Sequence, residues 1–146
     1  MQQLNFPSFD FQIISESGET KIFDTIRKKY VQLTPEEWVR QHVVRYLVEN
    51  KGYPQMLIQV EGSIKVGKMN KRCDVIAYNK QMQPILLVEC KRSDVELTQE
   101  VFDQIFRYNL RLGVSKMFVT NGIKHYCISV LGEKVEFLSD VPYFEL

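Results

Sequence analysis

Short apolar runs separated by polar turns recur along the chain, and two longer segments have the periodicity of a helix. The most continuous apolar run lies within residues 84–91, where four apolar residues precede an acid, a thiol and a base. A run of this kind predicts a strand that is buried on both faces. A second strand-like run spans residues 72–78, and the polar residues 79–83 between the two runs predict a turn. Together they predict a hairpin of adjacent antiparallel strands.

Both helical segments carry signals at their ends. The first helix is predicted over residues 34–50, with Thr34 as the N-cap and Pro35 at the first helical position. The second is predicted over residues 99–112, and Gly113 is expected to end it. In each segment apolar residues recur every three or four positions, which is typical of a helix with one buried side.

The remaining segments predict further strands and turns. Residues 1–10 lack periodicity and are expected to form a loosely docked arm, whereas residues 21–33 are expected to be extended. Asn121-Gly122 predicts a two-residue type I′ hairpin turn. Further strands are expected at residues 11–14, 56–66, 116–120, 123–130 and 135–138. At 146 residues, the chain is expected to be one domain spanning 1–146.

Residues 62–68 match the first seven positions of a phosphate-binding P-loop, G-x-x-x-x-G-K. The next residue is Met69, where that loop needs Ser or Thr for Mg²⁺, and the segment leads into another strand, whereas a P-loop opens a helix. The match therefore does not predict nucleotide binding. Gly62 is instead expected to permit a β-bulge and Gly67 a turn.

Charged residues gather at the open end of the predicted hairpin. Side chains alternate along a strand, so Glu89 and Lys91 share one face and Cys90 points to the other. Asp74 lies about as far before the turn as Glu89 lies after it, so their carboxylates are expected side by side. Two carboxylates and a lysine at one point could hold Mg²⁺ through oxygen ligands and orient a water molecule.

These residues resemble a known signature. Asp74 followed by Glu89-Cys90-Lys91 is similar to the PD-(D/E)XK nuclease superfamily pattern of an acid and a later Glu-x-Lys. Residues 104–108, Gln-Ile-Phe-Arg-Tyr, resemble the Gln-x-x-x-Tyr motif of a branch that includes nuclease domains of exonuclease and restriction helicases. Residues 33–41 resemble the first helix of the N-terminal domain of type I restriction enzyme R subunits.

The resemblance covers roughly residues 20–130, and its one departure is Cys73, where the superfamily has Pro before the Asp. It implies an α/β restriction-endonuclease-like core: a central mixed β-sheet flanked by helices in the order αβββαβ, with extra N- and C-terminal strands. It also implies that Asp74 and Glu89 bind Mg²⁺ or Mn²⁺ together with the carbonyl of Cys90. Lys91 would orient or deprotonate the attacking water.

The two helices would add further residues to this site. Gln104 and Tyr108 are stacked one turn apart and would contact the water network or the DNA, although Tyr108 could instead belong to the core. In the first helix, the phase favours Glu36 over Glu37 as the acid facing the site, because Glu37 points nearly opposite the apolar stripe. Related first helices likewise have Glu four residues before Arg, here Glu36 and Arg40. Either acid could instead only complement the helix dipole.

Basic residues precede Asp74 in the chain and are expected, together with Arg40, to contact nucleic-acid phosphates. They are Lys65, Lys68, Lys71 and Arg72. A merely solvated hairpin explains them equally well. The net charge is only +1, so any nucleic-acid surface must be local. Three cysteines and two histidines favour a reducing cytoplasm and argue against a disulfide framework or a structural zinc site.

The leading hypothesis is a metal-dependent deoxyribonuclease, an endonuclease acting on DNA. One alternative is a catalytically silent nucleic-acid-binding module of the same fold. Another is a nuclease subunit that is active only with a separate helicase, translocase or specificity subunit. No segment resembles a signal peptide or approaches the length of a membrane span, so no membrane partner is expected.

Overall fold

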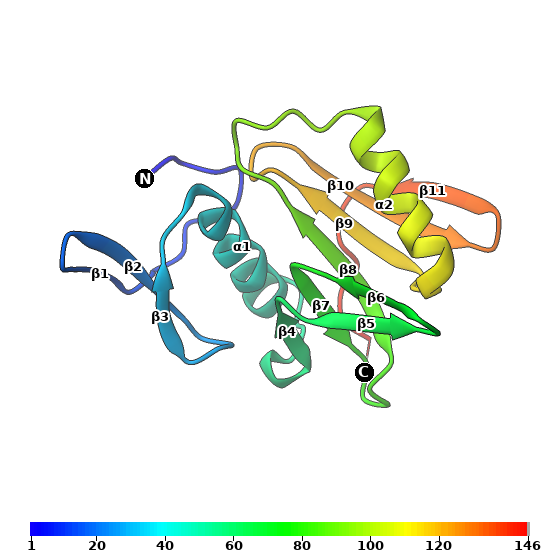
Figure 1. The fold of residues 1–146 in the computed structure, drawn as a ribbon, viewed down its shortest axis with the longest axis horizontal. Coiled ribbons are helices and arrows are strands. Elements are labelled where there is room, and N and C mark those ends of the chain that lie inside the picture. The colour runs from blue at the N-terminus through cyan, green and yellow to red at the C-terminus, as the bar shows by residue number, and fades with distance from the viewer. Residues whose placement is uncertain (146) are drawn as a thin grey trace.

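The computed structural model describes residues 1–145, apart from the side chains of Val66, Met69, Tyr108, Leu110 and Arg111. Within this part of the chain, two α-helices accompany a large sheet, a small N-terminal sheet and a two-stranded hairpin (Figure 1). In Figure 1, helix α1 lies between the N-terminal sheet and the large sheet. No helix of the described chain combines the length and apolarity needed to cross a membrane.

The large sheet has six strands in the order β11-β10-β9-β8-β7-β4. Its strands are β4 (Ile58–Val60), β7 (Val75–Tyr78), β8 (Pro84–Cys90), β9 (Lys116–Thr120), β10 (His125–Leu131) and β11 (Lys134–Leu138). The β8–β9 pair is parallel and its other pairs are antiparallel. Helix α2 (Gln99–Leu112) makes the crossover that a parallel pair requires. Helix α1 (Pro35–Arg45) precedes these strands in the chain. The two helices and the large sheet together form the predicted mixed α/β fold.

The central hairpin has the predicted register. Val75 of β7 pairs with Val88 of β8, and the strands separate at a turn over residues 79–83. The Asn79 side chain stabilises this turn by accepting hydrogen bonds from the backbone N–H groups of Gln81 and Gln83. Because the pairing is antiparallel, residues just outside Val75 and Val88 meet at the far end of the hairpin.

Both helices begin and end close to the predicted positions. The Thr34 hydroxyl accepts a hydrogen bond from the backbone N–H of Glu37 at 3.1 Å, and α1 continues as a π-helical turn over Tyr46–Asn50. Helix α2 ends at Gly113, whose φ of 70° is the left-handed conformation that glycine adopts easily.

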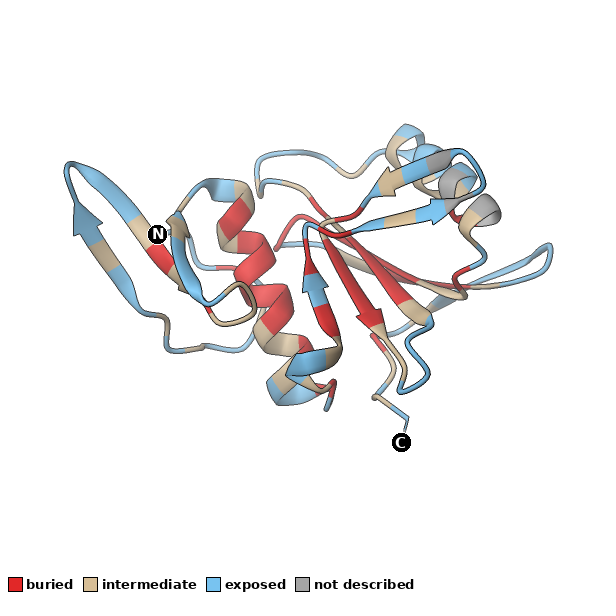
Figure 2. Ribbon diagram, turned by 60° about the horizontal axis from the view of Figure 1, so that its bottom comes forward, coloured by how far each residue is buried: buried red, intermediate tan, exposed pale blue. Residues whose placement is uncertain are grey.

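The core has one layer on each face of the large sheet. Apolar residues of α1 and its π-helical turn, among them Val39, Val43 and Leu47, pack against Val75 and Val88. On the α2 side a smaller cluster forms, made of Cys73, Ile76, Leu87 and Val114. Figure 2 shows the burial concentrated in α1 and the central strands, whereas the N-terminal sheet and the two-stranded hairpin are largely exposed.

The N-terminal region is more ordered than its sequence predicted. Residues 21–33 are not one extended segment, because Asp24 accepts hydrogen bonds from the N–H groups of Ile26 and Arg27 and closes a turn. The resulting antiparallel sheet contains β1 (Ile13–Glu16), β2 (Glu19–Asp24) and β3 (Lys29–Gln32).

The N-terminal arm is docked firmly, so the expectation of a loosely docked arm is wrong. Leu4 is buried, and the Asn5 N–H donates to Gly122 O at 2.7 Å. His125 Nε2 donates to Asn5 O at 2.6 Å, and Trp38 Nε1 donates to a carbonyl of the arm at 2.7 Å. The arm therefore joins α1 to the β9–β10 loop.

Two local predictions are corrected. Residues 56–66 do not form one strand, because Glu61 takes a φ of 53° and separates β4 from the hairpin of β5 (Ser63–Val66) and β6 (Met69–Arg72). This hairpin turns at Gly67 and leads into β7, so the predicted turn and the strand after it are both present. Asn121-Gly122 is part of a four-residue loop rather than a type I′ turn, because Asn121 Oδ1 accepts from two backbone N–H groups.

Candidate active site

Three acids lie in a row across the ends of β4, β7 and β8. The pairing of Val60 with Val75, and of Val75 with Val88, places Glu61, Asp74 and Glu89 next to one another. The Glu61 N–H donates to Asp74 O at 2.9 Å, which continues the ladder to this point. Asp74 and Glu89 are thus neighbours at the open end of the hairpin, as predicted.

Two donors fix the carboxylate of Asp74, whose side chain is only 16% exposed. Oδ2 accepts from the Cys90 N–H at 2.7 Å, and Oδ1 accepts from Arg40 Nη2 at 3.1 Å. The first bond comes from the strand that carries Glu89 and the second from α1. Asp74 is therefore oriented by both the sheet and the helix, while each oxygen keeps a lone pair for a further ligand.

Arg40 is buried among carboxylates rather than presented at the surface. Nη1 donates to Glu37 at 2.6 Å and Nη2 to Glu36 at 3.4 Å, in addition to its bond with Asp74. Burial alone would lower the pKa of Arg40, but the charges of Glu37 and Asp74 outweigh it and raise the pKa. The phosphate contact expected of Arg40 stays a prediction, since here its terminal nitrogens face acids.

Glu37 links the site to the N-terminal sheet. Its carboxylate is buried and accepts from Arg27 Nη2 at 2.8 Å and from Gln41 Nε2 at 3.0 Å. Arg27 Nε in turn donates to Asp24 at 2.7 Å. The helical phase placed Glu37 opposite the apolar stripe, but the β2–β3 turn covers that side of α1. Glu36 remains 44% exposed and reaches Asp74 through their shared contact with Arg40.

Glu89 lies in a strongly perturbing electrostatic environment. Burial raises the pKa of Glu89 to about 7, the Asp74 carboxylate adds to the shift, and Lys71 opposes it. Lys71 Nζ lies 3.6 Å from Glu89 Oε1. Lys91 follows β8 directly, is half-buried, and also favours ionised Glu89. A positive charge added beside Asp74 and Glu89 would relieve their mutual repulsion.

Helix α2 also brings two residues near Glu89 that were not predicted. Ile105 and Asn109 line a small cavity beside Glu89, whereas Gln104 is exposed on the helix. The Tyr108 side chain lies outside the described residues. The contacts of Gln104 and Tyr108 with water or DNA therefore stay predictions.

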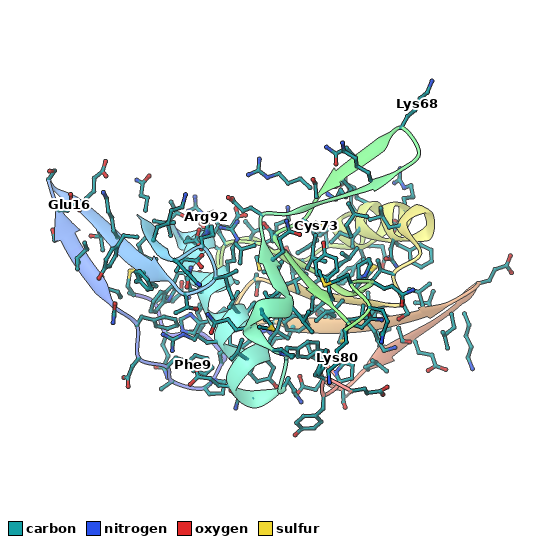
Figure 3. All side chains as sticks on the ribbon, turned by 90° about the horizontal axis from the view of Figure 1, so that it is seen from below. Phe9, Glu16, Lys68, Cys73, Lys80 and Arg92 are labelled. Atoms are coloured by element: carbon teal, nitrogen blue, oxygen red, sulfur yellow. The ribbon has the colours of Figure 1, made fainter. Side chains whose placement is uncertain are left out.

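The basic residues of the β5–β6 hairpin divide into two groups. Lys65, Lys68 and Arg72 are exposed, and Figure 3 shows Lys68 at the tip, pointing away from the body of the domain. Lys71 instead points toward the acids and pairs with Glu89. The hairpin thus carries positive charge from the acid row outward, and its contact with nucleic acid stays a prediction.

Sequence reasoning missed Glu61 and the contact between Arg27 and Glu37, and it ranked Glu37 behind its neighbour. Glu61 lies 3.2 Å from Arg27 and 3.5 Å from Arg72 and has a strained backbone beside Asp74. An acid at a strand end carries no signal by itself. The antiparallel register of three strands was needed to align Glu61 with Asp74.

The donor chemistry of Asp74 and Glu89 fits a hard cation. Mg²⁺ is commonly held by one or two carboxylates, with water and substrate oxygens completing its shell. In the described part of the chain, no group of three or more His, Cys, Asp or Glu side chains is placed to hold a metal. The binding of Mg²⁺ or Mn²⁺ by Asp74 and Glu89 therefore stays a prediction.

Residues 35–142 match the model of the family described as type I restriction enzyme R protein N terminus. The chain belongs to this family. A solved fragment of a protein assigned as the HsdR subunit of a type I restriction enzyme from Vibrio vulnificus YJ016 has the same fold, with a TM-score of 0.56 and 22% identity. The similarity covers 76% of this chain and 24% of that one, so this R-protein domain spans about a quarter of its length.

A protein from Anabaena variabilis ATCC 29413, assigned as a nuclease of family DUF820, is a more distant structural neighbour. Its TM-score is 0.46 and its identity 12%, over 87% of this chain and 80% of that one. Among curated proteins, none matches this chain. The family match and the shared fold together identify this chain as an N-terminal domain of the R-protein family with the fold of the HsdR fragment.

Proposed function

We propose that this R-protein domain is a metal-dependent endonuclease that hydrolyses DNA phosphodiester bonds. The observation that carries the proposal is the pair Asp74 and Glu89 at the end of the central hairpin, followed directly by Lys91. Paired oxygen ligands beside a lysine provide what phosphodiester hydrolysis needs: a place for a cation and a group that stabilises negative charge.

Each residue would have a distinct task. Asp74 and Glu89, with the carbonyl of Cys90, would hold Mg²⁺ or Mn²⁺, which would polarise the scissile phosphate when bound. The Nζ of Lys91 would orient the attacking water and stabilise the charge that develops on the phosphate oxygens.

The helices would position these groups. Arg40 holds Asp74 in one orientation and would keep it there during the reaction. Glu36 would support Asp74 indirectly, because both accept hydrogen bonds from Arg40. Gln104 would order water near the acids. Lys65, Lys68, Lys71 and Arg72 would guide the DNA backbone toward the site.

A nucleic-acid-binding module without turnover is the second candidate. One observation favours it: the described residues contain no group of three metal-binding side chains, so cation binding by the free domain would be weak. The exposed lysines of the β5–β6 hairpin would serve binding equally well without any cleavage.

The family also suggests a larger context. This domain spans a quarter of the matched HsdR fragment, and we propose that in the cytoplasm it works with a separate helicase, translocase or specificity subunit. Cleavage by the isolated chain would then be slow, while metal binding at Asp74 would persist.

The test is cleavage of supercoiled and linear DNA with Mg²⁺ or Mn²⁺, comparing wild type with Asp74→Ala and Lys91→Ala. Glu133→Gln, in the exposed β10–β11 turn, is the matched control. Metal-dependent nicking that both site variants lose and the control retains is the expected result. Mn²⁺ binding without cleavage, lost in Asp74→Ala, would indicate a nuclease that needs a partner. Absence of both would refute the enzyme and leave the binding module.

A further inference from the structure

Lys71 of the β5–β6 hairpin holds its ammonium beside Glu89. Its Nζ lies 3.6 Å from Glu89 Oε1, and the two side chains are 26% and 17% exposed. Lys71 pairs across the hairpin with Ile64, so both side chains leave the same face, and Ile64 packs on the apolar cluster around Leu87. Lys65 belongs to the opposite face and is exposed. The packing of Ile64 therefore directs Lys71, and not Lys65, toward the acids.

The two acids of the site have counter-ions of different kinds. Asp74 is held by Arg40, whose side chain is 8% exposed and also donates to Glu37 at 2.6 Å. Glu89 is approached by Lys71, on a flexible four-carbon stem and from a hairpin that lies outside the large sheet. A buried guanidinium that is shared among acids cannot leave without exposing unpaired charge, whereas a partly exposed ammonium can turn into water at lower cost. Of the two cations, Lys71 is therefore the displaceable one.

We propose that Lys71 is a built-in competitor of the metal: its ammonium takes the cation position at Glu89 in the metal-free domain and must leave for a divalent ion to bind there. An ammonium and a divalent ion held by one carboxylate repel each other, and at such short separation the repulsion exceeds the attraction of one partly exposed ion pair. Lys71 therefore compensates the charge of Glu89 in the absence of metal and raises the metal concentration at which the site fills. This inference rests on the proposed function.

The first test is Mn²⁺ binding by calorimetry without DNA. It is carried out at about pH 8.5, because burial raises the pKa of Glu89 to about 7 and a proton would otherwise compete with the ion. Lys71→Met keeps an apolar stem and removes the charge, and it is expected to bind Mn²⁺ about 5-fold more tightly than wild type, the ratio that corresponds to the loss of one such ion pair. Lys65→Met, which removes the same charge from the opposite face of the hairpin, is expected to bind like wild type.

The outcomes separate this inference from the proposed function. Binding by wild type without a gain in Lys71→Met overturns the competition and leaves the proposed nuclease standing. An equal gain in Lys71→Met and Lys65→Met would show a general effect of net charge and would also overturn it. If neither wild type nor Lys71→Met binds Mn²⁺, the proposed nuclease and the competition fail together.

The second test follows the Lys71 ammonium itself by NMR relaxation. In metal-free wild type the ammonium is expected to be restrained, and it should become more mobile in Glu89→Gln and when Mg²⁺ saturates wild type. Glu36→Gln, which removes the same charge from an acid beside Arg40, is the control and is expected to leave the ammonium restrained. In protein that calorimetry shows to bind the ion, an ammonium whose mobility does not change on Mg²⁺ saturation overturns the exchange.

Discussion

Replacing Glu37 with Gln is expected to destabilise the domain far more than the same replacement of its neighbour Glu36. Both changes remove one negative charge from the first turn of α1 and preserve side-chain shape. Glu37 is 6% exposed and receives bonds from Arg27, Arg40 and Gln41, whereas Glu36 is 44% exposed and lies 3.4 Å from Arg40. The pair therefore isolates the effect of burial.

The magnitude follows from the bonds that change. Hydrogen bonds to charged groups contribute about 1.5–3 kcal/mol each, and Glu37 accepts two from guanidinium groups, at 2.8 and 2.6 Å. The glutamine oxygen keeps part of each bond, so a loss of about 3 kcal/mol in the free energy of unfolding is expected, close to that for breaking a buried ion pair. Glu36→Gln should cost at most about 0.5 kcal/mol, as for other exposed pairs.

Urea denaturation at pH 7 measures this difference, and thermal unfolding should show Glu37→Gln melting about 10 °C below Glu36→Gln. Because the Glu37 bonds are buried, the gap should persist at high salt. Equal costs for the two variants, or a loss below about 1 kcal/mol for Glu37→Gln, would refute the assignment of Glu37 as the link between α1 and the N-terminal sheet.

Three further outcomes are expected. Burial lowers the pKa of His125, so as the pH falls below the ordinary value of 6.5 the unfolded chain takes up a proton before the folded protein does. The free energy of unfolding should therefore decline below that pH. Its slope against pH should be shallower in His125→Asn. In urea titrations, Gly122→Ala should lower the free energy of unfolding more than Gly132→Ala. Both glycines have positive φ, so each alanine adds a strain of about 1 kcal/mol. Only at Gly122 would the new Cβ also lie 2.9 Å from Leu4. By fluorescence anisotropy at several salt concentrations, replacing Lys65 and Lys68 with Ala should weaken DNA binding and reduce the salt slope by about 2, and an unchanged slope would contradict phosphate contact.

The sequence by itself determined the central hairpin, both helices and the position of Asp74 beside Glu89. These features depend on local signals: an apolar run, a polar turn, an N-cap at Thr34 and a terminating glycine at Gly113. Antiparallel pairing around a short turn leaves little freedom in register, so two residues equidistant from that turn can be matched from the chain alone.

Only the tertiary structure decided which other side chains join the acids. The helical phase of α1 identified its apolar stripe but not that the N-terminal sheet buries the opposite side, which places Glu37 between Arg27 and Arg40. Glu61 joined the row because β4 pairs with β7, and Asn109 because α2 packs over Glu89. Such contacts join segments far apart in sequence, and hydrophobic periodicity specifies that a face is buried without specifying what buries it.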